Sequence, residues 1–391
     1  MWLKMKILII LHKAKKQGGL SLQFLKMTKE FRKKDHDVKI FSYDSLEYIN
    51  SPIIRAISIY RELKKTIVGF NPDIIFTSDP FITSIYPIII SKKKHSIILR
   101  IGADCHSFYA ARFNEKLFGK ANVSGLFYKM NKIILKFISK IILKKIDLVI
   151  FNSKFLKKKP YKGVENSTVI YNGVEFKGIK NIRIHDPIKL VYVGRIEPRK
   201  TLELIVNSVN LLKKKNISFH LSIIGNISDN PRYLKKLSKM ISYYELKDRI
   251  KFLGEIENIN LPKILQGHDI LLFSTDNRNF PITEGLPNVI LEGMANGLAI
   301  VATPVAGVPE IISPKNGFLA KPNPESFAEK IIRLIKEPHL LLKIKKANVE
   351  EVKNNYTIAG TSNGYLRVFQ YIIEKEIYCR GDKNTNNKTM Y

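Results

Sequence analysis

Short apolar runs alternate with longer amphipathic segments along the first half of the chain. The runs are rich in Ile, Val, Leu and Phe, and the segments between them carry apolar residues at helical spacing. Near-continuous apolar strands that alternate with helices are typical of a parallel sheet covered on both faces. The pattern therefore predicts a Rossmann-like, doubly wound α/β domain, with strands at 6–11, 37–42, 73–77, 95–101, 147–151 and 168–171.

The same alternation resumes after a polar stretch at residues 175–187, which we interpret as a linker. The second set of apolar runs predicts strands at 188–193, 219–224, 250–253, 269–273 and 298–303. A length of 391 residues also fits two domains of about 190 residues each. We place the boundary near residue 180, which gives domains of 1–180 and 181–359.

The end of the chain divides into a helical segment and a polar tail. Apolar residues recur at helical spacing over about 365–376, which predicts a helix over about 360–378, whereas 379–391 is polar and contains few apolar side chains. A segment with so little apolar surface cannot offset the entropy that ordering costs. We expect the tail 379–391 to be disordered.

Cysteine usage and apolar run lengths bear on the compartment. Cys105 and Cys379 lie far apart, without metal-like spacing, which fits a reducing compartment without a disulfide framework. The run 7–11 is too short for a signal peptide or a membrane span, and no later stretch reaches about 18 uninterrupted apolar residues. We therefore expect a cytoplasmic protein that is not secreted and does not cross a membrane.

The net charge is +32, and most of the excess lies in the first half of the chain. Residues 1–186 contain 36 Lys and Arg against 14 Asp and Glu, a balance of +22, whereas residues 187–391 carry +10. A basic surface attracts an anionic partner, and nucleic acid and an anionic membrane surface are both candidates. Aromatic residues are not interleaved with the basic runs as in nucleic-acid-reading motifs, so we expect no nucleic-acid partner.

Residues 129–145 predict a strongly basic amphipathic helix. Lys132, Lys136, Lys140 and Lys144 recur every four residues, and isoleucines fill the neighbouring positions. Such a helix is typical of proteins that lie in a membrane interface. An ordinary Rossmann helix, with its apolar face on the sheet and its lysines in water, explains the same pattern. The +22 charge favours contact with an anionic membrane surface, which would place the protein peripherally at the inner face of the membrane.

Two carboxylates flank a helix that is predicted to span about 286–296. Glu284 precedes the helix and Glu292 lies inside it, while Leu286, Pro287 and Asn288 form its start, with Pro287 in the first turn. The amides and the dipole at a helix start favour an anion such as a diphosphate, and a carboxylate can accept two hydrogen bonds from a sugar diol. The arrangement therefore suits a nucleoside-diphosphate sugar. Alternatively, Glu284 complements the helix dipole and Glu292 faces water.

The segment from Glu284 to Glu292 resembles the E-x7-E motif of retaining GT-B glycosyltransferases. It is most similar to glycosyltransferase family 4, the glycosyltransferase group 1 type. The resemblance implies that Glu284 contacts the transferred sugar and that Glu292 contacts the ribose. It also implies the GT-B fold, in which two Rossmann-like doubly wound domains face a central cleft and the last helix, here about 360–378, completes the first domain.

Cations follow the first predicted strand of the second domain. Gly194 and Arg195 come directly after the strand, and Lys200 comes before a predicted helix. A glycine turn followed by Arg and Lys can clamp a diphosphate, since both side chains donate to phosphate oxygens. The spacing Gly-Arg-x4-Lys resembles the family pattern in which these cations neutralise the leaving nucleoside diphosphate. Arg195 and Lys200, with Glu284, are therefore the predicted catalytic residues, and Thr201 stands where the family often has Gly.

Two glycines follow the first predicted strand of the chain. Gly18 and Gly19 match the glycine-rich turn with which the family lines the acceptor side of its cleft. Glycine permits close backbone approach to a ligand, but a pair of glycines can equally close a turn.

The loop after the fourth predicted strand matches the family only in part. Gly102 and Asp104 fit its His-Gly-x-Asp sequence, but Ile101 stands where the family has a His that helps to hold the transferred sugar. The nearby Arg100 or His106 could reach the same space. The resemblance thus assigns Gly102 and Asp104 to the acceptor side and leaves the catalytic contact there unassigned.

These features predict a retaining, hexosyltransferase-type glycosyltransferase. It would move a sugar from a nucleoside-diphosphate sugar to a glycan or lipid-linked acceptor, in surface polysaccharide or glycolipid synthesis. We expect neither a cofactor nor a metal, because the cations and the helix start supply positive charge for the leaving diphosphate. The alternatives are a nucleotide-sugar 2-epimerase of GT-B fold and a catalytically silent relative that binds carbohydrate or nucleic acid.

Overall fold

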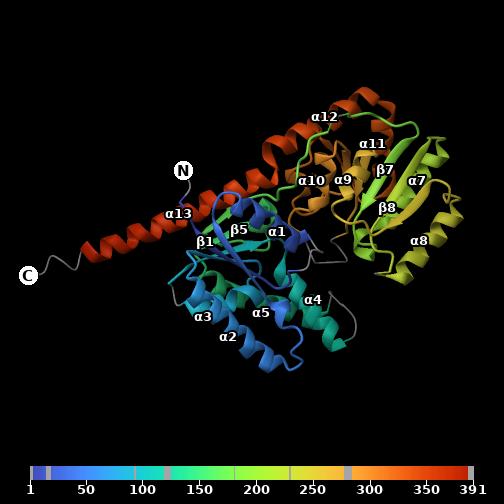
Figure 1. Cartoon of the computed structure of the whole chain (residues 1–391). Coiled ribbons are helices and arrows are strands. Elements are labelled where there is room, and N and C mark those ends of the chain that lie inside the picture. The colour runs from blue at the N-terminus through green and yellow to red at the C-terminus, as the bar shows by residue number, and fades with distance from the viewer. Residues whose placement is uncertain are drawn as a thin grey trace, which may run out of the picture. The chain divides into compact units, whose positions relative to one another are not determined.

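The computed structural model describes residues 3–14, 19–91, 94–118, 125–179, 181–228, 230–276 and 284–385. The chain forms two compact units (Figure 1). Unit 1 consists of Met1–Gly173 and Ile358–Tyr391, and unit 2 consists of Val174–Thr357. The sequence places the boundary near residue 180, a few residues after the division observed here.

The described part of unit 1 contains a six-stranded parallel sheet in the order β2-β1-β3-β4-β5-β6. Its strands are β1 (Lys6–Leu11), β2 (Asp37–Ser42), β3 (Ile74–Thr77), β4 (Ser96–Ile101), β5 (Leu148–Phe151) and β6 (Ser167–Val169). Its helices are α1 (Gly19–Arg32), α2 (Pro52–Phe70), α3 (Ile82–Ser91), α4 (Cys105–Phe118), α5 (Leu126–Leu143), α6 (Lys154–Lys158), α13 (Ile358–Thr385) and the 3₁₀ turn η1 (Tyr43–Leu46).

Helices cover both faces of this sheet. One apolar core joins the sheet to α1 and α13, and a second core, on the other face, joins it to α2, α3 and the end of α5. Figure 1 shows α2, α3 and α5 together on the side of unit 1 opposite α13. Burial on both faces explains why the strands read as continuous apolar runs.

The helix α13 packs onto the sheet of unit 1 through large apolar side chains. Tyr365, Leu366 and Phe369 are at most 1% exposed, and the Phe369 ring centroid lies 5.2 Å from that of Phe76 on β3. The helix continues to Thr385. The predicted disorder of the tail 379–391 is therefore wrong for residues 379–385, and residues 386–391 lie outside the described part.

Unit 2 has a second six-stranded parallel sheet within the described residues, in the order β12-β11-β10-β7-β8-β9. Its strands are β7 (Ile188–Val193), β8 (Phe219–Ile224), β9 (Ile250–Gly254), β10 (Ile270–Phe273), β11 (Ala299–Ala302) and β12 (Gly317–Leu319). Its helices are α7 (Leu202–Lys214), α8 (Pro231–Tyr243), α9 (Leu261–Gln266), α10 (Asn288–Ala295), α11 (Pro324–Lys336), α12 (Pro338–Asn355) and the 3₁₀ turns η2 (Pro198–Lys200) and η3 (Val308–Glu310).

The predicted fold class is confirmed by these two units. Each is a parallel, doubly wound α/β sheet, and most predicted strands match the observed ones to within one or two residues. None of the helices in the described part of the chain is both long enough and apolar enough to span a bilayer.

Candidate active site

The carboxyl ends of β7 and β10 form the edge of unit 2 where a ligand is expected. The strand order runs away from this central pair in opposite directions, and open parallel sheets bind ligands at such a switch point. Hydrogen bonds join the loops that follow the two strands. Ser274 Oγ donates to Lys200 O at 2.6 Å, and Asp276 N donates to Arg199 O at 3.0 Å. The cations predicted after β7 therefore sit at the switch point.

Arg199, Lys200 and Glu284 form an ion-pair cluster at this edge. Glu284 Oε1 accepts hydrogen bonds from Arg199 Nη2 at 2.9 Å and from Lys200 Nζ at 3.0 Å. The side chains of Arg199 and Lys200 are 7% and 8% exposed, whereas that of Glu284 is 35% exposed. The carboxylate is thus the part of the cluster that solvent, or a ligand, can reach.

The cluster carries an excess of positive charge and an unused donor. Glu197 Oε1 also contacts Arg199 Nη2 at 3.0 Å and Arg195 Nη2 at 3.4 Å, so three cations face two carboxylates. Arg199 Nη1 is buried and donates to no partner in the described part of the chain. Because a buried donor without a partner is costly, this N–H group is suited to an anionic ligand.

The pKa values in the cluster reflect burial opposed by charge pairing. Burial alone would raise the pKa of Glu284, but the charges of Lys200 and Arg199, with their hydrogen bonds, lower it to about 2. Burial lowers the pKa of Lys200, and the Glu284 charge offsets part of that effect. Burial also acts to lower the pKa of Arg199, but the charges of Glu284 and Glu197 raise it overall. Glu284 is therefore ionised throughout the neutral range.

The structure distinguishes between the cations after β7. Lys200 is in direct contact with Glu284, whereas the Arg195 side chain is 63% exposed and pairs with Glu197 in the described part of the chain. Arg199, which the sequence left unassigned, holds the buried position. Arg199 and Lys200 are both buried in the 3₁₀ turn η2, which Pro198 begins.

Gly194 has a packing reason to be glycine. A Cβ at this position would lie 2.9 Å from the Tyr192 hydroxyl oxygen. That hydroxyl donates to Arg195 O at 2.9 Å, which fixes the start of the loop. The backbone of Gly194 is also approached by the loop after β8, where a Cβ on Gly225 would lie 2.0 Å from Gly194 O.

Thr201 adopts a conformation that explains why glycine suits its position. Its backbone is left-handed, with φ 41°, and its side chain makes no capping hydrogen bond to α7. A Cβ in this region costs about 1–2 kcal/mol. We expect Thr201→Gly to raise the free energy of unfolding by up to about 1 kcal/mol, since glycine's own entropy cost offsets part of the relief. Thermal denaturation measures the change.

Thr201→Ala is the matched control for this prediction. Alanine keeps the Cβ that makes the left-handed region unfavourable, so this variant should gain no stability. A glycine variant less stable than the alanine variant would contradict the assignment of strain to Thr201.

The helix α10 carries the second predicted carboxylate. It begins at Asn288, with the buried Pro287 as its N-cap residue, so it is shorter than the predicted 286–296 and Pro287 precedes its first turn. Leu286 is 3% exposed, and Glu292 lies partly exposed in the second turn. Gly307 N donates to Gly285 O at 2.8 Å, which fixes the loop that carries Glu284. Glu284 and Glu292 thus flank one helix start.

Three of the four residues predicted for the acceptor side lie in the described part of unit 1. Gly18 lies outside the described residues, and Gly19 is the first residue of α1. Gly102 O accepts from Asn152 Nδ2 at 3.5 Å. Asp104, 5% exposed, accepts from Ser107 N at 3.2 Å at the start of α4. Burial alone would raise the pKa of Asp104, but hydrogen bonds from its neighbours and the charge of a nearby lysine lower it to about 2.

Two basic residues, Arg100 and His106, were suggested to reach the space that the histidine occupies in the family. Both are buried and form hydrogen bonds inside unit 1. Arg100 is 2% exposed, and its Nε donates to Tyr365 Oη at 3.1 Å, which ties α13 to the sheet. His106 is 1% exposed, and its Nε2 lies 2.7 Å from Ser139 Oγ on α5. The suggestion that Arg100 or His106 reaches a sugar is therefore corrected: both stabilise unit 1 internally.

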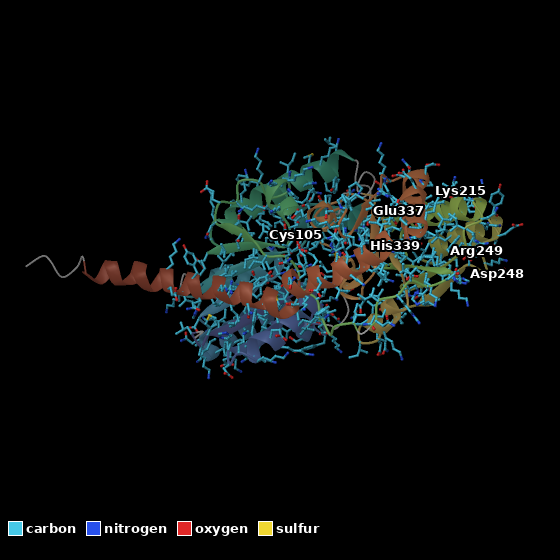
Figure 2. The ribbon with its side chains drawn as sticks, turned by 90° about the horizontal axis from the view of Figure 1, so that it is seen from above. Cys105, Lys215, Asp248, Arg249, Glu337 and His339 are labelled. Atoms are coloured by element: carbon cyan, nitrogen blue, oxygen red, sulfur yellow. The ribbon has the colours of Figure 1, made fainter. Side chains whose placement is uncertain are left out.

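Metal-binding and thiol groups are not prominent in the described residues. Within those ranges, no group of three or more His, Cys, Asp or Glu could hold a metal ion. Cys105, labelled in Figure 2, is a free cysteine of unit 1. Burial raises the pKa of its thiol well above the usual value, which keeps it in the unreactive protonated form.

The family of unit 2 follows from a comparison with known proteins. Residues 175–351 match the family described as glycosyl transferases group 1, and they cover nearly the whole of Val174–Thr357. The second unit is a group 1 glycosyltransferase domain. Its match includes the ion-pair cluster of Arg199, Lys200 and Glu284.

Relatives extend the similarity beyond this domain. The uncharacterized glycosyltransferase MJ1069 of Methanocaldococcus jannaschii is 28% identical over 367 residues, which cover 88% of this chain and 87% of that protein. The putative colanic acid biosynthesis glycosyltransferase WcaL of Salmonella typhimurium is 25% identical over 162 residues, or 41% of this chain and 37% of WcaL. The chain is a glycosyltransferase.

Solved structures confirm the predicted GT-B fold. A glycosyltransferase from Rickettsia africae has a TM-score of 0.72 at 19% identity, covering 95% of this chain and 99% of that one. HepE of Anabaena, solved in complex with UDP, has a TM-score of 0.71 at 17% identity, covering 94% of this chain and 100% of that one. At these identities the likeness concerns the fold alone.

Proposed function

We propose that this glycosyltransferase is a retaining enzyme of family 4 that uses a nucleoside-diphosphate sugar as donor. The observation that carries the proposal is the cluster at the switch point of unit 2, where buried Arg199 and Lys200 share the exposed carboxylate of Glu284. An anionic diphosphate matches the positive excess of the cluster and the unused Arg199 Nη1 donor. The Anabaena protein HepE, which shares the fold, has been solved with UDP-glucose.

The proposed roles follow the chemistry of each side chain. Lys200 and Arg199, with the more exposed Arg195, stabilise the charge that develops on the departing nucleoside diphosphate. The start of α10, which Leu286 and Pro287 precede and Asn288 begins, adds a positive dipole end and the backbone N–H groups of its first turn.

The two carboxylates of the motif bind the uncharged sugar and ribose of the donor. Glu284, ionised because its pKa is about 2, accepts from hydroxyls of the transferred sugar, and Glu292 accepts from the ribose diol. Because protein cations cover the diphosphate, we propose that transfer needs no metal ion and no cofactor.

We further propose that the acceptor is a glycan or a lipid-linked glycan in surface polysaccharide or glycolipid synthesis. Two relatives are named for such pathways: WcaL for colanic acid biosynthesis, and AmsK of Erwinia amylovora, 28% identical over 153 residues, for amylovoran biosynthesis. The +22 charge of residues 1–186 supports a peripheral location at the inner face of a cytoplasmic membrane, with anionic lipid rather than nucleic acid as partner.

Donor turnover tests the proposal. Purified protein is screened against nucleoside-diphosphate sugars by thermal shift, and the stabilising donor is incubated with candidate acceptors with and without EDTA. We expect release of the nucleoside diphosphate, a glycoside with the donor's anomeric configuration, and unchanged turnover in EDTA. Inversion of configuration would refute the retaining mechanism, and loss of turnover in EDTA would refute transfer without a metal ion. Epimerised donor formed without an acceptor would refute transfer itself.

A further inference from the structure

The helix α5 turns its apolar side to solvent. Six of its apolar side chains recur at helical spacing and are 39–67% exposed. We name this surface the α5 stripe, and it consists of Met130, Ile133, Ile134, Phe137, Ile138 and Ile141. Water-facing apolar rows of this length are unusual on a soluble domain and mark a site of interaction.

The buried residues of α5 include Ile142 and Leu143 at its end and two polar side chains, and the contacts of its polar residues fix this orientation. Tyr128 and Ser139 are 4% and 2% exposed, and Ser139 Oγ lies 2.7 Å from His106 Nε2 on α4. Lys132 Nζ lies 3.6 Å from Asp104 Oδ2 at the start of α4. Rotating the α5 stripe toward the sheet would break both contacts, so the apolar side stays outward.

The exposed apolar surface extends beyond the α5 stripe at its N-terminal end. Leu126 is 75% exposed, and Phe127 stacks on Phe113 of α4 with ring centroids 6.3 Å apart. Phe113 is itself 54% exposed. Two neighbouring helices therefore contribute to one apolar surface.

The charges around the α5 stripe identify the kind of partner. Lys129, Lys136 and Lys140 are exposed, and their spacing of seven and four residues places them along one flank of the stripe. The sequence has no acidic residue between Glu115 and Asp147. A row of cations beside large apolar side chains matches a bilayer surface, where lipid phosphates lie beside acyl chains.

We propose that the α5 stripe docks on an anionic lipid bilayer, with α5 lying in the plane of the interface. Phe137, Ile133 and their neighbours enter the acyl boundary, and the flanking lysines contact lipid phosphates. This identifies the surface behind the peripheral location proposed above. It involves no residue of the cluster in unit 2, so docking and sugar transfer can fail separately.

Vesicle binding by the full chain tests the proposal. The wild-type protein should float with vesicles of phosphatidylcholine and phosphatidylglycerol at low salt, and much less with phosphatidylcholine alone or at high salt. Ile133→Ser with Phe137→Ser should weaken binding by at least about tenfold. Replacing Lys129, Lys136 and Lys140 by Gln should weaken it on the order of 100-fold at low salt, at roughly fivefold for each lysine.

Matched controls use exposed residues of unit 2. Tyr243→Ser with Ile259→Ser removes two apolar side chains that are 83% and 75% exposed. Replacing Lys214, Lys215 and Lys247 by Gln removes three exposed lysines, of which Lys215 is labelled in Figure 2. Both control proteins should bind vesicles as the wild type does.

Three outcomes would overturn the proposal. They are wild-type protein that ignores anionic vesicles, stripe variants that bind as well as their controls, and a wild-type dimer that the two serine substitutions dissociate. The last outcome would make the α5 stripe an interface with a second copy. Transfer to a soluble acceptor should be equal in all variants, and its absence with intact vesicle binding would count against the proposed function alone.

Discussion

Glu284→Gln is expected to lower kcat for sugar transfer by about 100- to 1,000-fold, with little change in the donor KM. In the folded protein Glu284 Oε1 is the shared acceptor of Arg199 Nη2 at 2.9 Å and Lys200 Nζ at 3.0 Å. An amide oxygen carries no negative charge, so both cations would lose the partner that orients them toward the leaving group. Steady-state kinetics with the nucleoside-diphosphate sugar selected by the thermal-shift screen measure the effect.

The pH dependence of the wild-type enzyme follows from the same contacts. The pKa of Glu284 is lowered from 4.5 to about 2, so its folded value lies below its unfolded value. The stability that the ionised carboxylate contributes is present above pH 4.5 and is lost as the pH falls toward 2. Between about pH 5 and pH 9 no ionisation of Glu284 should therefore appear in kcat or in the melting temperature.

Glu292→Gln is the matched comparison, because it makes the same chemical change on the same motif. Its proposed contact is with the ribose, which is bound equally in the ground state and the transition state, so KM for the donor should rise about tenfold with little change in kcat. Thermal denaturation of both variants excludes unfolding as the cause. Wild-type kinetics in both variants, or the two effects exchanged, would refute the assignment.

Much of the fold could be predicted from the sequence because parallel strands that are buried on both faces consist of continuous apolar residues. The run 188–193, for example, coincides with β7, and residues 6–11 coincide with β1. The tail was mispredicted because composition describes how much apolar surface a segment has. Composition does not show that Tyr365 and Phe369 are buried in the same helix, which then continues through a polar stretch to Thr385. Adding residues to an existing helix costs less than starting a new one.

From the sequence, the candidate site could be predicted only as residue types and their separations along the chain. Glu284 was proposed from the E-x7-E spacing and Lys200 from the Gly-Arg-x4-Lys spacing, and the structure brings the two side chains together. Arg199 was missed because Arg195 and Arg199 follow the same strand, and the sequence does not show that the Arg199 side chain is 7% exposed and the Arg195 side chain 63% exposed. The periodicity of a sequence does not show which side of a loop or helix is buried against the rest of the domain.

The orientation of α5 illustrates the same limit. A regular row of lysines beside isoleucines predicts an amphipathic helix, and the usual Rossmann arrangement would bury the isoleucines. The structure buries Ile142 at the end of the helix and Ser139, which pairs with His106, but leaves Ile133 67% exposed. A contact between residues far apart in the sequence decides the rotation of the helix.

Lys345→Met is expected to lower the free energy of unfolding of the protein by about 3–5 kcal/mol, the largest effect on stability that we predict. Lys345 Nζ on α12 lies 2.7 Å from Asp269 Oδ1, and the two side chains are 3% and 0% exposed. Lys345 Nζ also donates to Arg183 O at 2.7 Å and to His268 O at 3.2 Å. Burial lowers the pKa of Lys345, and the Asp269 charge offsets part of that effect.

The cost arises because the carboxylate of Asp269 would remain buried without its cation. Asp269 precedes β10 and accepts from the backbone N–H groups of His185 and Lys189, so it holds the amino end of the sheet together. Methionine fills a similar volume but donates no hydrogen bond, and a buried charge that loses its partner is expensive. Denaturant unfolding followed by circular dichroism measures the loss.

Two further variants separate this mechanism from a general effect of substitution on α12. Lys346→Met changes the exposed neighbour and should stay within about 0.5 kcal/mol of the wild type. Asp269→Asn combined with Lys345→Met removes the buried charge itself and should recover part of the loss. If Lys345→Met were as stable as Lys346→Met, or if the double variant were no more stable than Lys345→Met alone, the ion pair would not be what holds this end of unit 2.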